Sequence, residues 1–452
     1  MISVKNYLPD STDPAQVTQA FQRAIDTAST ESDDGVVMVP PGNYTISMIR
    51  LHSRVTLHLC PGAVLTACPD LDIYPNLPRG HNKDRQPYHL IFAEDCDDIC
   101  ISGQGVIDGN GPAFWSGLVY PDMPWIKANP RRISPLVEIR NCRNVVLKDF
   151  TINNSPGWTV HPYNCDHVRI EGITINNHMY GPNTDGIDIN GCRYVFLSNC
   201  RIHGCDDNII IKATPDARAS EYITITNCVL ESNCAAIGLG AETTSGIRHV
   251  TVSNCTVINA IRVIQIILWG GGTVENIAIS NISGRALTPI GTDRVIHFDI
   301  QNFDQNTKTE VPPERSGVLR NVIISNVICE TRGRILLTAR EGARMENITL
   351  RDIQLIYPEV EDPAVTIPKS RSNQLSNFNP EARVARAAVV ADNIANLALE
   401  NISTTWLNSP TVPMHAFWGR KIRKGRLHCP ALTPSQPGVA PYEMTDCDIQ
   451  FL

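Results

Sequence analysis

Short stretches of alternating apolar and polar residues recur along the chain at a nearly constant spacing. Each stretch starts at an aromatic residue, His or Asn, and the clearest copies are Asn144-Val-Val-Leu, His167-Val-Arg-Ile, Tyr194-Val-Phe-Leu, Tyr222-Ile-Thr-Ile, His249-Val-Thr-Val and Asn276-Ile-Ala-Ile. Their starts lie 23, 27, 28, 27 and 27 residues apart. A period of two over so few residues predicts a strand and is too short for a helix.

This spacing predicts a solenoid. Further copies start at Arg54, Asp98, Asn321, Asn347 and Asn396, and no helical pattern separates the strands, which argues against a sheet with crossover helices. A coil of 22–28 residues with two or three short strands cannot bury its apolar side alone, so it is stable only when stacked. We therefore expect an all-β protein with the fold of a right-handed parallel β-helix.

We expect one domain over residues 1–452. Residues 1–50 would form an N-terminal cap and the first coil, 51–405 the stacked coils, and 406–452 a C-terminal cap. Loop insertions are predicted at 109–135, 283–292, 302–317 and 357–386. Residues 14–28 read as an amphipathic helix with Val17, Phe21, Ala24 and Ile25 on one face, and such a helix would cover the open end of the stack.

Asparagines end successive strands at the same place in each coil, at positions 199, 227, 254 and 281, and the register continues through Asn326, Asp352 and Asn401. Such residues stack their side-chain amides along the axis and tolerate the left-handed turn between sheets. Cys200, Cys228 and Cys255 follow this ladder directly, which predicts an inward stack of small apolar thiols.

Composition narrows the function classes. Apolar residues make up 42% and charged residues 19% of the chain, and the net charge of −7 comes without a basic cluster, so we expect no nucleic-acid partner. No apolar run is long enough for a membrane span, and the first residues lack the apolar core of a secretory signal. Fifteen cysteines without zinc-type spacing predict reduced, buried thiols and no metal or cofactor. We expect a cytoplasmic protein, or a secreted one whose signal was removed.

Three aspartates mark the middle coils. A second series of strands starts at Trp158, Gly186, Asn208, Ala236 and Ile264, with gaps of 28, 22, 28 and 28 residues, and these should be neighbours in one sheet. Asp185 precedes one strand and Asp206-Asp207 the next, so the three carboxylates should meet on one surface. Like charges that close separate their pKa values, which allows one carboxyl to act as an acid while another activates water. Glycoside hydrolysis requires that pair.

The same residues resemble the family-28 glycoside hydrolases, the polygalacturonases and their relatives. The likeness covers roughly residues 35–350, and its motifs are Gly105–Trp115, Asn154–His161, Asn183-Thr-Asp-Gly-Ile-Asp188, Gly204-Cys-Asp-Asp-Asn-Ile-Ile-Ile-Lys212 and Ile237–Val250. The resemblance implies inverting hydrolysis of pectic or related glycans. It implies Asp206 as the general acid, with Asp185 and Asp207 holding and deprotonating the attacking water.

Two departures from the family bear on the substrate. Where the family usually has Gly-His-Gly, this chain has Ser232-Asn233-Cys234, and Asn233 can hydrogen-bond but cannot titrate. Where the family offers Arg-x-Lys, a cradle for a uronate carboxylate at the +1 subsite, this chain has Gln265 and Ile267. The resemblance therefore implies an altered +1 subsite, and rhamnogalacturonan-like or neutral substituted substrates become more plausible than plain polygalacturonate.

Further residues are candidates for contact with an oligo- or polysaccharide. Beside the three catalytic candidates, we expect substrate binding by Asn183, Asn233, Gln265, Lys212, His161, Trp158 and Arg262, with Arg294 as another source of positive charge. For several of them a packing or solvated role explains the sequence as well. The oligomeric state does not follow from the sequence.

Other functions stay open at this point. A polysaccharide lyase or uronate epimerase can use the same fold, but both need a base beside the uronate carboxylate, and the absence of Arg-x-Lys counts against them. A non-catalytic carbohydrate-binding solenoid is the third class, and the missing histidine keeps it open. Exo action would follow if the insertions at 302–317 and 357–386 closed one end of the groove.

Overall fold

A computed structural model describes the chain apart from residues 120–124, 289–292, 302, 305–308, 313–314, 365–378 and 409. The described part is almost entirely β-strand and divides into two compact units. Unit 1 comprises residues 1–119, 125–210 and 216–228, and unit 2 comprises 211–215 and the described residues from 229 to 452. The candidate site residues fall in both units.

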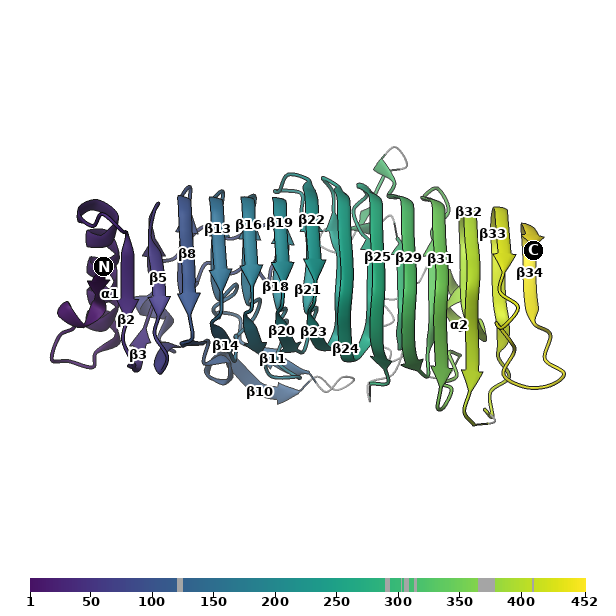
Figure 1. Cartoon of the computed structure of the whole chain (residues 1–452), viewed down its shortest axis with the longest axis horizontal. Helices are drawn as coiled ribbons and strands as arrows, with labels where there is room; N and C mark the ends of the chain where they lie inside the picture. Colours follow the sequence, from purple (N-terminus) through teal and green to yellow (C-terminus); the bar gives the residue numbers. More distant parts are fainter. Residues whose placement is uncertain are drawn as a thin grey trace. The chain divides into compact units, whose positions relative to one another are not determined.

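Unit 1 is a stack of coils with three parallel sheets (Figure 1). The first sheet contains β2 (Val36–Val39), β5 (Thr56–Leu59), β8 (Asp97–Gly103), β13 (Arg143–Lys148), β16 (Asp166–Glu171), β19 (Arg193–Ser198) and β22 (Ser220–Thr226). The second contains β3 (Gly42–Ile46), β6 (Ala63–Ala67), β9 (Val106–Asp108), β14 (Thr151–Asn153), β17 (Thr174–Asn176) and β20 (Arg201–Gly204). The third contains β4 (Ile49–Leu51), β7 (Ile91–Glu94), β12 (Val137–Arg140), β15 (Val160–Tyr163) and β18 (Ile187–Asn190).

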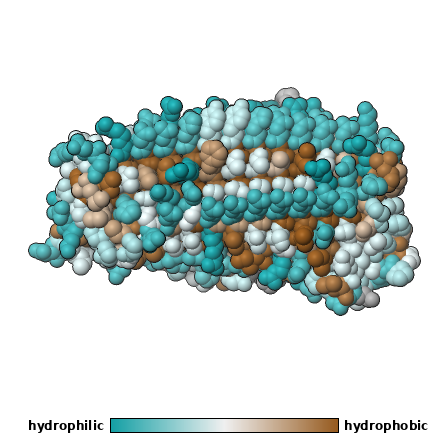
Figure 2. Space-filling model, viewed as in Figure 1, coloured by the Kyte–Doolittle hydropathy of each residue, from teal (hydrophilic) through white to brown (hydrophobic). Residues whose placement is uncertain are grey.

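The predicted alternation explains how each coil is buried. In β16, Val168 and Ile170 are buried while Arg169 between them is exposed, and in β19 the buried residues Val195 and Leu197 stand opposite them. Apolar residues of successive coils therefore stack on one another inside the unit. Hydrophilic side chains cover much of the visible outer surface (Figure 2).

A helix lies at the N-terminal end of unit 1, as predicted, and packs against the first strands (Figure 1). Helix α1 (Pro14–Glu31) begins after Asp13, whose side chain accepts a hydrogen bond from the Ala15 N–H, and Pro14 stands at its first position. Its predicted apolar face is buried, with Phe21, Ala24 and Ile25 fully inaccessible. The helix covers apolar surface that the first coil would otherwise expose.

Unit 2 has the same architecture with longer strands. One parallel series contains β23 (Val229–Thr243), β24 (Ile247–Leu268), β25 (Thr273–Ala286), β29 (Val318–Thr331), β31 (Arg344–Tyr357), β32 (Ala387–Trp406), β33 (His415–His428) and β34 (Tyr442–Phe451). A second series runs from β24 through β26 (Arg294–Ile300) and β30 (Arg334–Ala339) to β32. The predicted parallel β-helix is confirmed, and the assignment of the whole chain to one domain stays a prediction.

Two of the predicted irregular regions contain regular strands. β25 extends to Ala286, inside the insertion expected at 283–292, and β33 and β34 extend the parallel series through 406–452. The sequence pattern did not predict the strands of the last coils, because Lys421 and Lys424 occupy the left-handed turn positions that asparagines occupy in other coils. Their φ angles are 52° and 57°. The insertion at 109–135 contains the antiparallel pair β10 (Trp115–Val119) and β11 (Ile126–Ala128), and those at 302–317 and 357–386 lie partly outside the described residues.

The asparagine ladder is confirmed. Asn281 accepts a hydrogen bond from the Asn326 amide at 3.1 Å and donates one to Asn254 at 3.0 Å, and all three residues have φ near +57°. A second ladder joins Asn276, Asn321, Asn347 and Asn396, which the sequence analysis had taken only as strand starts. All fifteen cysteines are free thiols, and Cys200, Cys228 and Cys255 are buried as predicted. Among the described residues, no helix combines the length and apolar character needed to cross a bilayer.

The ladder gives a first testable prediction. Asn281→Ala removes two amide hydrogen bonds and replaces asparagine with a residue that tolerates the left-handed region less well, so the free energy of unfolding should fall by about 2 kcal/mol. Asn281→Gly loses the same hydrogen bonds without the conformational penalty and should be the less destabilised of the two. Thermal unfolding of both variants tests this. Equal melting temperatures for the two variants would show that the turn conformation contributes nothing.

Candidate active site

The three aspartates of the sequence analysis lie at the same turn of neighbouring coils in unit 1. Asp185 lies two residues before β18 (Ile187–Asn190), and Asp206 and Asp207 lie three and two residues before β21 (Ile209–Ala213). The Gly186 N–H donates to the Asp207 carbonyl at 2.9 Å, and the Thr159 N–H donates to the Asp185 carbonyl at 3.0 Å. The hydrogen bonds of the sheet therefore bring residues 22 positions apart in sequence to adjacent places.

These carboxylates differ in their exposure. Asp185 is 4% exposed and Asp207 8%, whereas Asp206 is half-buried, and its carboxylate accepts a hydrogen bond from the Asp207 N–H at 3.1 Å. Asn183 stands two residues before Asp185 in a left-handed turn with φ of 50°. Its side-chain oxygen accepts a hydrogen bond from Arg132, which joins the turn to another segment of unit 1.

The register of the third sheet differs by one residue from the expected one. The sequence spacing paired Trp158 with Gly186, 28 residues on, but Val160 pairs with Ile187, 27 residues on. Unit 2 shows the same difference, because Ile237, not Ala236, pairs with Ile264. Apolar residues stand beside the paired positions in both the expected and the observed register. The apolar pattern alone therefore did not determine the register, which is set by the backbone hydrogen bonds between the strands. His161 consequently stands level with Asp188.

A buried network of charges surrounds Glu138 on β12, one strand before His161. The fully buried Glu138 carboxylate accepts hydrogen bonds from Arg140 Nε at 2.5 Å and His161 Nδ1 at 2.6 Å. Arg85 approaches it to 3.6 Å and forms a second ion pair with Asp216 at 2.8 Å. Burial by itself raises the pKa of Glu138, but attraction to His161, His89 and Arg85 prevails and holds that pKa well below its ordinary value.

The sequence analysis missed Glu138, Arg85 and Arg140. A signal was present, since Val137-Glu-Ile-Arg140 places two charges in a strand that is otherwise apolar. Glu138 and Arg85 have partners 23 to 131 positions away in sequence, so this pairing could be recognised only in the folded chain.

His161 and Trp158, both candidates for substrate contact, are enclosed in this part of unit 1. His161 is fully buried, and its Nε2 meets the Asn190 amide at 3.3 Å. Trp158 is 2% exposed, its ring lies edge-on to His161, and its backbone N–H donates to Ser134 Oγ at 3.0 Å. Their role in binding stays a prediction, and the contacts described here are with the protein.

Unit 2 contains the other four candidates. Lys212 forms an ion pair with Glu242 at 3.0 Å, and both side chains are almost fully buried. Gln265 is 3% exposed, and its side-chain oxygen accepts a hydrogen bond from Arg262 at 2.7 Å. Asn233 is 4% exposed. The guanidinium of Arg262, three residues earlier on the same strand, thus places a positive charge beside Gln265.

A cavity of about 1280 Å³ also lies in unit 2, lined by segments that include Asp392, Arg420, Lys421 and Asp446. None of the residues that the sequence marked as catalytic or substrate-binding lines it. Its size alone therefore does not connect it with the predicted chemistry.

Comparison with known proteins adds the family. Residues 37–374 match the model of the glycosyl hydrolases family 28. A "Probable polygalacturonase" of Vitis vinifera is 29% identical over 333 residues, which is 69% of this chain and 65% of the grape protein. The alignment thus spans slightly less than two thirds of that relative's own length.

Two solved structures share the fold. An exopolygalacturonase from Thermotoga maritima superposes with a TM-score of 0.70 at 22% identity, over 89% of this chain and 91% of that one. A family 28 exopolygalacturonase from Yersinia enterocolitica superposes with a TM-score of 0.72 at 17% identity. That superposition covers 100% of this chain and 77% of the Yersinia chain. The family match covers most of the chain and includes both aspartate motifs. This chain therefore belongs to the glycosyl hydrolases of family 28.

Proposed function

We propose that this protein hydrolyses glycosidic bonds in pectic polysaccharides or oligosaccharides with inversion at the anomeric carbon. The observation that carries the proposal is the position of Asp185, Asp206 and Asp207 at one turn of adjacent coils, held by the hydrogen bond from Gly186 to Asp207. In the proposed mechanism Asp206, the most exposed of the three, protonates the leaving oxygen. Asp185 and Asp207 bind and deprotonate the attacking water, which is the division of roles that inversion requires.

A time-resolved test separates this reaction from its alternatives. Proton NMR of early products from an oligogalacturonide should show the anomer opposite to that of the substrate bond. Retention of configuration would contradict the assignment of two residues to water. Growth of ultraviolet absorbance would identify a lyase, and binding without release of reducing ends would identify a non-catalytic solenoid.

The action is proposed to be exo, because one side of the aspartates is covered by protein within unit 1. An enzyme that cuts inside a polymer needs a groove open on both sides of the scissile bond. Here the outward side chains of β12 and β15, Glu138 and His161, are 0% exposed. Arg85 lies over the Tyr163 ring at 4.2 Å and extends across to Asp216. Sugar units cannot lie along this stretch of the sheet while these contacts persist.

Arg132 holds the segments around Asp84 and Arg132, which we call the cover, beside Asp185. Its guanidinium donates to the carbonyls of Pro156 and Pro182, pairs with Asp84 at 2.9 Å and reaches Asn183 at 3.3 Å. Two segments that precede and follow β7, around Asp84 and Arg132, are therefore tied directly to the turn that positions Asp185. This closure supports exo action from the covered end. The residues that make this closure lie outside 302–317 and 357–386, the two insertions that the sequence suggested for closing one end of the groove.

Product analysis tests the exo mode. Long polygalacturonate should release one short product from the first minutes, while its viscosity falls slowly relative to the number of new reducing ends. Arg132→Ala removes four contacts of the cover and should introduce products of mixed length. Arg169→Ala, a change at an exposed arginine of β16, should leave the product pattern unchanged. A ladder of intermediate lengths from the unmodified protein would rule out exo action.

The +1 subsite is proposed to be altered from that of polygalacturonases with the Arg-x-Lys cradle. Ile267 is buried and apolar, and the Gln265 side-chain oxygen is already bonded to Arg262. Neither side chain supplies a cation of its own. The compartment in which the protein acts stays a prediction from the sequence.

A further inference from the structure

Three arginines stand side by side in unit 2, and we refer to them as the arginine stack. Arg262 on β24 pairs in register with Arg294 on β26, and Arg294 pairs with Arg334 on β30. Neighbouring strands lie about 4.8 Å apart, so the three side chains leave the backbone at closely spaced points. Their exposed fractions are 3%, 3% and 1%. Buried charges of one sign at this spacing repel each other strongly.

The hydrogen bonds of the stack do not cancel its charge. Arg262 donates to Gln265 and to Cys234, and Arg294 donates to the Asp293 carbonyl. The Asp293 carboxylate, which lies nearby, is engaged by Arg332 at 2.8 Å and Thr288 at 2.7 Å. The charge of Glu361 attracts Arg294 and Arg334. Burial above all, together with the charge of Arg262, lowers the pKa of Arg294 to about 10 despite attraction to Glu361 and Asp293.

His297 stands on β26 in register with Gln265 on β24, and the charges of all three arginines act on its ring. It is fully buried, and neither of its ring nitrogens has a hydrogen-bond partner among the described residues. Burial and the charges of Arg262, Arg294 and Arg334 hold the pKa of His297 well below its ordinary value, so the ring is neutral. The Nε atoms of Arg262 and Arg294 also lack partners within the described chain. Buried donors of this kind normally meet an acceptor.

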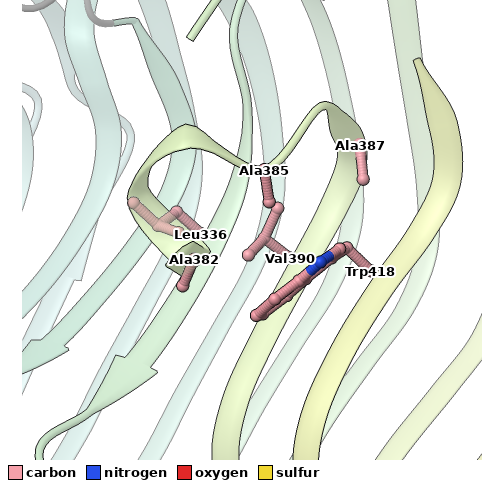
Figure 3. Close-up of a cluster of buried hydrophobic side chains, with 6 residues drawn as sticks. All are labelled: Leu336, Ala382, Ala385, Ala387, Val390 and Trp418. Carbon is pink, nitrogen blue, oxygen red and sulfur yellow. The ribbon is translucent and has the colours of Figure 1, made fainter. Parts of the chain in front are cut away.

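Arg334 is fixed by the segment that contains helix α2 (Pro380–Val384). Its guanidinium donates to the carbonyls of Arg383 and Ala385. Ala382 and Ala385 of the same segment pack with Leu336 and Val390, and Ala387 and Trp418 complete the cluster (Figure 3). This packing holds the far end of the stack rigid. The Nε of Arg334 lacks a partner among the described residues, as do those of Arg262 and Arg294, but both terminal nitrogens of Arg334 are already bonded to this segment.

We propose that the arginine stack is an anion site that binds the carboxylate of an acidic sugar residue, with Arg262 and Arg294 as the ligating groups and His297 beside them. A carboxylate offers two oxygens in the plane that guanidinium groups recognise, and it neutralises the repulsion within the stack. The inference rests on the proposed function, because a pectic substrate brings uronate groups to the protein. It assigns carboxylate recognition to cations on three strands, at positions other than the motif residues Gln265 and Ile267.

Equilibrium binding tests the site without turnover. We would titrate the full-length protein with D-galacturonate, with its uncharged methyl ester and with inorganic phosphate, by calorimetry. Galacturonate should bind, while the methyl ester should bind more than about tenfold more weakly because it lacks the charge. Arg262→Gln and Arg294→Gln should each weaken galacturonate more than about tenfold. Arg351→Gln, at an exposed position of β31, should leave the affinity unchanged.

Stability gives an independent readout. Arg294→Met replaces a poorly compensated buried charge with an apolar chain, so the ligand-free melting temperature should stay equal or rise while galacturonate protection is lost. A lower melting temperature with unchanged galacturonate affinity would show that the stack is only structural. Equal affinity for galacturonate and its methyl ester, or for phosphate, would overturn the carboxylate assignment. Failure of the hydrolase proposal would appear instead as absent reducing-end release with galacturonate binding intact.

Discussion

Asp206→Asn should lower kcat for an oligogalacturonide about a thousandfold or more, since general acid catalysis contributes a factor of about 10² to 10⁴ and the two remaining carboxylates cannot replace the lost proton donor. Asparagine has nearly the same shape and still accepts the hydrogen bond from the Asp207 N–H. Substrate binding should therefore persist, with KM changing far less than kcat. Steady-state release of reducing ends, measured with the melting temperature, separates a chemical defect from unfolding.

Asp97→Asn is the matched control for this change. Asp97 is exposed on β8 in the same unit and belongs to none of the motifs. That variant should retain full activity. If Asp206→Asn kept comparable activity while both variants melted at the temperature of the unmodified protein, Asp206 would not be the acid. Asp185 or Asp207 would then be the next position to substitute.

The sequence predicted the fold well because the β-helix repeats a local rule. Each coil must alternate apolar and polar residues and must turn at a residue in the left-handed conformation. Asn199, Asn227 and Asn254 therefore identify coils whose sequences are otherwise dissimilar. The rule failed where another residue took the turn. Lys421 and Lys424 adopt the same conformation, and with no asparagine to mark them the last strands looked like a cap.

The candidate site was predictable only where its members share one motif. Asn183, Asp185, Asp206 and Asp207 are close in sequence, and one coil of spacing brings them together. Arg85 and Glu138 are 53 residues apart, and the local sequence around each residue does not predict that the other is its partner. The arginine stack is intermediate. Its members occupy equivalent positions in three strands, but insertions of unequal length conceal the register.

The charge network around Glu138 has a measurable consequence for stability. Glu138→Gln should lower the free energy of unfolding at neutral pH by about 3 to 5 kcal/mol, because it leaves Arg85 and Arg140 buried without the carboxylate between them. Chemical denaturation followed by fluorescence measures the change. Glu171→Gln is the control, since Glu171 makes only a solvent-exposed pair with Arg169 at 3.8 Å and its loss should cost less than about 1 kcal/mol.

The pH dependence distinguishes a charge effect from a packing effect. The pKa of Glu138 is well below the ordinary value of 4.5 in the folded protein, so the folded state binds fewer protons than the unfolded state in the range between the two pKa values. The contribution of Glu138 is therefore complete above pH 4.5 and is lost as the pH falls through the folded pKa. The difference in stability between the unmodified protein and Glu138→Gln should shrink over that range. A difference that stays constant from neutral to acidic pH would mean that the variant loses packing and not an ion pair.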